Sequence, residues 1–109
     1  MNEATILKQR RQARAAKHLV DSALLDLHRK AANALLDTPA GVLIRERALQ
    51  QVEKWDRGHL CNPSYVQAWR SILNLPFKSI AAAMLRDDAQ GIALRQNSPF
   101  GFLINEAAE

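Results

Sequence analysis

Apolar residues recur at steps of three or four along the first third of the chain. The series consists of Ala13, Ala16, Val20, Leu24, Leu27, Ala31 and Leu35. This spacing returns to one face of an α-helix and predicts a long amphipathic helix over about residues 4–36. Residues 1–12 offer few apolar anchors, so we expect them to form a frayed basic arm at the free end of this helix.

A second helix is marked by a capping residue followed by proline. Thr38 suits the N-cap and Pro39 the first helical position. The apolar positions that follow predict a helix to about Arg57. Gly58 then stands where a left-handed residue commonly ends a helix, because glycine has no Cβ to clash there.

A third helix begins with the same signal, since Asn62 precedes Pro63. It should end before Pro76, because the residue preceding a proline is disfavoured in the α region. A fourth helix is expected over about residues 76–86. Either Asp87 or Asp88 can cap a short fifth helix. The Ser98-Pro99 pair should end this helix.

The last segment, residues 98–109, reads as an apolar tail. Its Phe100, Phe102, Leu103 and Ile104 are expected to dock on the helices, or to wait for a partner if they do not. Connections throughout are short, and no strand hairpin is evident. The chain of 109 residues is therefore expected to be a single domain, an all-α, compact bundle of four to five helices with a long amphipathic N-terminal helix.

Composition adds two expectations. No apolar run approaches the roughly 20 residues that cross a bilayer, and no signal-peptide core follows the N-terminus. Cys61 is the single cysteine, so it has no intramolecular disulfide partner. We expect a cytoplasmic protein without a membrane partner.

The charge is concentrated at one end. Residues 1–17 carry five cations and one acid, a net +4 that equals the formal charge of the whole chain. The five are Lys8, Arg10, Arg11, Arg14 and Lys17. Segment 8–17 resembles in composition the arginine-rich RNA-binding peptides of some phage and viral proteins. That resemblance implies an anionic partner, and the alternative is a solvated helix face.

Catalytic and metal-binding patterns are weak. His59 and Cys61 lack a second pair of ligands at zinc spacing, and Asp87-Asp88 fits helix capping better than acid–base chemistry. No phosphate loop or nucleophile motif occurs. We therefore expect no enzyme, no cofactor, no metal site and no small-molecule ligand. A helix-turn-helix formed by the fourth and fifth helices, offering Arg95 and its polar neighbours to DNA, stays open as a minor alternative.

Two binding functions remain, and protein–protein interaction or self-association, including a homodimer, ranks first. Its candidate contacts are Leu24, Leu27, Leu35, Phe100, Phe102 and Leu103. The alternative is a regulator that binds DNA or RNA through segment 8–17. Its candidate contacts are Lys8, Arg10, Arg11, Arg14 and Lys17.

Overall fold

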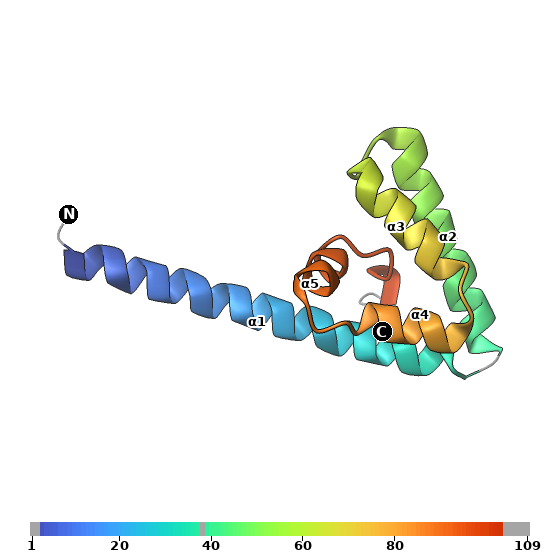
Figure 1. Cartoon of the computed structure of the whole chain (residues 1–109), viewed down its shortest axis with the longest axis horizontal. Helices are drawn as coiled ribbons and strands as arrows, with labels where there is room; N and C mark the ends of the chain where they lie inside the picture. The colour runs from blue at the N-terminus through green and yellow to red at the C-terminus, as the bar shows by residue number, and fades with distance from the viewer. Residues whose placement is uncertain (1–2, 38, 104–109) are drawn as a thin grey trace.

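The computed structural model describes residues 3–37 and 39–103. Over these residues the chain is all-α, with five helices and no strand, as predicted. The helices are α1 (Glu3–Leu35), α2 (Ala40–Gly58), α3 (Pro63–Leu73), α4 (Phe77–Met84) and α5 (Ala89–Gln96) (Figure 1).

The four shorter helices and the C-terminal part of α1 form a body. Helices α2 and α3 run side by side, α4 lies along the C-terminal part of α1, and α5 packs on both α1 and α4 (Figure 1). The rest of α1 extends away from this body, so the molecule measures 56 × 28 × 28 Å. Its radius of gyration is 16.2 Å. A compact domain of this length would have about 13 Å.

The core lies where the four shorter helices meet the last turns of α1. Its largest fully buried side chains include those of Trp69, Phe100, Leu35, Leu73 and Ile80. Phe100 meets Trp69 edge-on, with ring centroids 5.7 Å apart. The apolar tail therefore docks on the helices as predicted, as far as Leu103. The remainder of the tail, including Ile104, lies outside the described residues.

Two predicted caps are confirmed by direct hydrogen bonds. The Asn62 side chain accepts from the backbone N–H of Ser64 at 2.9 Å at the start of α3. Asp88, rather than Asp87, caps α5 and accepts from the Gly91 N–H at 2.8 Å. Each cap satisfies a backbone donor that the first helical turn leaves without a partner.

The two ends of α2 differ from the predictions. Thr38 lies outside the described residues, and Pro39 precedes the helix, which begins at Ala40. At the other end Gly58 is still helical, and His59 takes the left-handed conformation with φ 51°. The turn closes one residue later than expected because the Leu60 N–H reaches the Trp55 carbonyl at 2.9 Å.

Candidate nucleic-acid interface

The projecting part of α1 is a free-standing helix. Every residue from 3 to 20 is exposed, and we call this stretch the arm. Residues 3–12, which belong to the stretch predicted to fray, are helical, and residues 1–2 lie outside the described residues. At about 1.5 Å per residue the arm is roughly 27 Å long.

A single line of side chains joins the arm to the body. Steps of four and three residues lead along one face of α1 through Arg10, Arg14, Lys17, Asp21, Leu24, His28, Ala31 and Leu35. Residues at this spacing share one helix face. The last residues of this line, His28, Ala31 and Leu35, are buried against the body. The first three, Arg10, Arg14 and Lys17, are cations. By this spacing, three cations of the arm lie on the side of α1 that bears the body.

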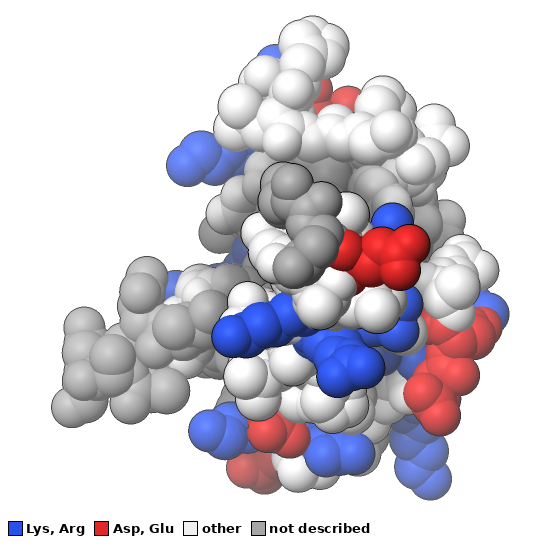
Figure 2. Space-filling model, turned by 90° about the vertical axis from the view of Figure 1, so that its left-hand side faces the viewer, with Lys and Arg blue, Asp and Glu red and all other residues white. Residues whose placement is uncertain are grey.

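The five cations cover half of the circumference of the arm. At 100° per residue, Lys17 and Lys8 lie roughly 180° apart. Arg10, Arg14 and Arg11 fall between them in that order. We call this side of the arm the basic half. Figure 2 views the molecule from the side on which the arm projects and shows Lys and Arg side chains spread across it.

The other half of the arm is uncharged, because Thr5, Gln9, Gln12, Ala13, Ala16 and Val20 share it. Leu19 and Val20 leave 69% and 56% of their surface exposed. The arm is thus amphipathic, with cations on one half and mainly small or apolar residues on the other.

The cations of the arm have no counterions among residues 3–37 and 39–103. Within the described part of the chain none of the five forms a salt bridge. Between Glu3 and Asp21 the arm carries no acid. The Asp21 carboxylate accepts a hydrogen bond from Gln96 Nε2 of α5 at 3.0 Å.

Several cations of the body are engaged, by contrast. Arg70 donates to Glu53 at 2.8 Å and to Asp56 at 3.1 Å, and these bonds raise the pKa of its guanidinium. Arg86 pairs with Asp88, and Arg29 pairs with Asp26. The guanidinium of Arg45 lies over the ring of Phe77. Uncompensated positive charge therefore accumulates on the arm.

The predicted apolar contact residues differ in how far they are buried. Leu24, Leu27, Phe102 and Leu103 are half-buried. Leu35 and Phe100 are fully buried in the core and expose no surface to a partner. The assignment of these two to an interaction surface is therefore corrected. Leu35 lies on the body-facing line of α1, and Phe100 packs against Trp69 and His28.

The helix-turn-helix interpretation of α4 and α5 finds no support in the side chains of α5. Arg95 is buried and donates to the carbonyls of Met84 and Arg86 at 3.0 and 2.8 Å. Gln96 is bonded to Asp21, and Asn97 Nδ2 donates to the Ala93 carbonyl at 2.9 Å. The buried Arg95 side chain is therefore not free to contact bases, and the Gln96 and Asn97 amides are engaged within the body.

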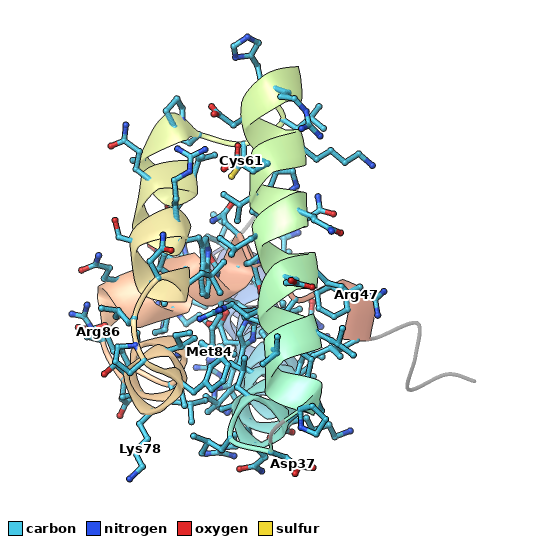
Figure 3. All side chains as sticks on the ribbon, turned by 90° about the vertical axis from the view of Figure 1, so that its right-hand side faces the viewer. Asp37, Arg47, Cys61, Lys78, Met84 and Arg86 are labelled. Atoms are coloured by element: carbon cyan, nitrogen blue, oxygen red, sulfur yellow. The ribbon has the colours of Figure 1, made fainter. Side chains whose placement is uncertain are left out.

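The other chemical candidates are not brought together. Among residues 3–37 and 39–103 no three His, Cys, Asp or Glu side chains gather as ligands for a metal ion. Cys61 lies at the connection between α2 and α3 (Figure 3). Asp88 is a helix cap, and its bond from the Gly91 N–H and its pairing with Arg86 lower the pKa of its carboxyl.

The residue that sequence reasoning missed is His28, at the base of the arm. It is fully buried, stacks on Trp69 with ring centroids 6.4 Å apart and meets Phe100 edge-on. Nδ1 donates to the Leu24 carbonyl at 2.6 Å, and Nε2 lies 2.7 Å from Ser98 Oγ. The only signal in the sequence is its place on the apolar face of the first helix.

The chain matches no known family model, no characterised protein and no solved structure, and these comparisons give no indication of an enzymatic activity. None of the described helices combines the length and the apolar character needed to span a membrane.

Proposed function

We propose that this protein binds nucleic acid through the basic half of its arm. The observation that carries the proposal is that five cations, which form no salt bridge among the described residues, lie on an exposed helix that projects from the body. Nucleic acids present a phosphate charge at regular intervals, and arginine pairs with phosphate through two parallel hydrogen bonds.

The charge arrangement favours a polyanion over solvent alone. Arg10, Arg11 and Lys17 each lie three or four residues from Arg14, and Lys8 lies three from Arg11. Each such like-charge pair costs an isolated helix a few tenths of a kcal/mol. Bound phosphates would remove the repulsion and stabilise the arm, so binding and helix formation are coupled.

The test is a titration of a labelled mixed-sequence nucleic acid, followed by fluorescence anisotropy at about 50 mM salt. We expect the variant R10A/R11A/R14A to bind at least about tenfold more weakly than the wild type. Its fold should be preserved, because these side chains make no ion pair in the described structure.

A matched control removes three cations from the body, Lys54, Arg57 and Lys78, all of them exposed. Lys78 points away from α4 into solvent (Figure 3). The variant K54A/R57A/K78A loses the same net charge and should bind nearly as well as the wild type. Absence of binding by the wild type, or equal weakening of the two variants, contradicts the proposal.

Self-association is a second candidate, and the exposure of Leu19 and Val20 on the uncharged half supports it. Such a helix face packs closely against a copy of itself, because alanines allow the backbones to approach. Sedimentation equilibrium would then show a dimer that persists at high salt and dissociates in L19Q/V20Q. A monomer at all concentrations contradicts this second function and leaves the first intact.

A further inference from the structure

We infer that the nucleic acid bound by the arm is double-stranded DNA and that the arm lies in its major groove. This inference rests on the proposed function and deepens it. It follows from how the charges are spread around the arm, because the number of charges alone would suit any polyanion.

The spread of the cations matches a groove with phosphates on both walls. A helix resting on a flat surface or beside a single strand needs cations along one edge only. Here Lys17 and Arg10 lie at one margin of the basic half and Lys8 lies at the other. An α-helix is about 10–12 Å across with its side chains, and the major groove of B-DNA is about 12 Å wide. Both margins can therefore meet phosphates at once.

The centre of the basic half would face the floor of the groove. Leu7, Arg11, Arg14 and His18 follow one another at steps of four, three and four residues, so they form one narrow stripe there. Arginine donates to the O6 and N7 acceptors of guanine in the major groove, and an apolar side chain contacts the thymine methyl group. Leu7 leaves half of its surface exposed.

The length of the arm is sufficient for the major groove. The roughly 27 Å of exposed helix is more than twice the groove's width of about 12 Å. Asp21, the first acid after the basic stretch, comes at the point where α1 meets the body and is already bonded to Gln96. No acid on the arm beyond its tip residue Glu3 would face the phosphates.

Double-stranded RNA does not suit the same arrangement. Its A-form major groove is too deep and narrow for side chains to read, and its shallow minor groove would not surround a helix. A single strand presents one row of phosphates and would engage one margin of the basic half. The geometry therefore selects duplex DNA among nucleic acids.

The experiment compares one sequence as duplex DNA, single-stranded DNA and duplex RNA at matched salt. We expect duplex DNA to bind at least tenfold more tightly than either competitor. We also expect bound protein to protect guanine N7 from dimethyl sulfate, which attacks from the major groove, and to be insensitive to netropsin, which occupies the minor groove.

A matched pair of variants distinguishes contacts with the floor of the groove from contacts with its wall. R11A and K8A each remove one charge and should lose similar affinity, but only R11A should alter the N7 protection pattern. Equal binding to all three nucleic acids, or duplex binding without N7 protection and with netropsin competition, overturns this inference and leaves the proposed function standing. Absence of binding to any of the three overturns both.

Discussion

His28 Nε2 and Ser98 Oγ lie 2.7 Å apart and join α1 to a segment seventy residues further along the chain. The Leu24 carbonyl can only accept, so Nδ1 carries the hydrogen and Nε2 accepts from the Ser98 hydroxyl. Ser98 Oγ in turn accepts from the Phe100 N–H at 3.1 Å. This chain of hydrogen bonds anchors the base of the arm to the core.

The buried imidazole makes stability depend on pH. Burial lowers the pKa of His28 below its ordinary value of 6.5, and the nearby Arg95 cation adds to the effect, while the bond to Leu24 opposes it. Well above pH 6.5 the imidazole is neutral in both the folded and the unfolded chain. As the pH falls below that value the unfolded chain binds the proton first, so the free energy of unfolding should decrease.

Urea unfolding between pH 8 and pH 5.5 measures this decrease, which one proton limits to about 1.4 kcal/mol per pH unit. The variant H18Q, which alters an exposed histidine of the arm, should show the same decrease in the free energy of unfolding. An NMR titration of the His28 ring in the wild type provides a direct check. A pKa of 6.5 or higher for His28 would contradict the prediction.

Removal of the Ser98 hydroxyl should be costly. In S98A the His28 Nε2 acceptor stays buried and loses its donor, so we expect a loss of about 1–3 kcal/mol in the free energy of unfolding. S79A, which removes an exposed hydroxyl from α4, serves as the control and should change stability by less than about 0.5 kcal/mol. Equal urea midpoints for S98A and S79A would argue against the anchoring role.

Two helical glycines should resist replacement by alanine. In an exposed helix interior this change normally stabilises by about 0.5–1 kcal/mol. Here a Cβ at Gly91 would collide with the Arg86 carbonyl, and one at Gly41 would collide with the Leu35 carbonyl. G91A and G41A should therefore lower the thermal midpoint. G101A, where nothing lies within 4 Å of the added carbon, should leave it nearly unchanged.

The left-handed residue at the end of α2 offers a stabilising change. His59 has φ 51°, where a side chain with a Cβ is strained and glycine is not. We expect H59G to raise the free energy of unfolding by up to about 1 kcal/mol, whereas H59A should not. Thermal denaturation of the two variants decides between this account and one in which the imidazole itself holds the turn.

Local chemistry made much of the fold predictable. The N-caps at Asn62 and Asp88 accept from donors only two and three residues away, so the adjacent sequence was sufficient to predict them. The apolar face of the first helix was also evident, since its period reflects the geometry of a single element. The left-handed turn at His59 was missed by one residue, because its position depends on which backbone carbonyls the turn reaches.

Contacts distant in sequence could not be predicted in the same way. The bond between His28 and Ser98 and the burial of Arg95 against two carbonyls depend on where α5 packs. The cations of the arm were visible in the sequence. Their lack of counterions among the described residues was not, because it depends on where along α1 the body begins.

The salt dependence of duplex DNA binding tests the central claim most directly. If the five cations of the arm each neutralise a phosphate, the logarithm of the binding constant should fall with the logarithm of salt concentration with a slope of about −4.5. Each single alanine replacement among the five should reduce this slope by about 0.9, and K78A on the body should not. A slope near zero, or one unchanged by loss of the arm cations, would contradict the account.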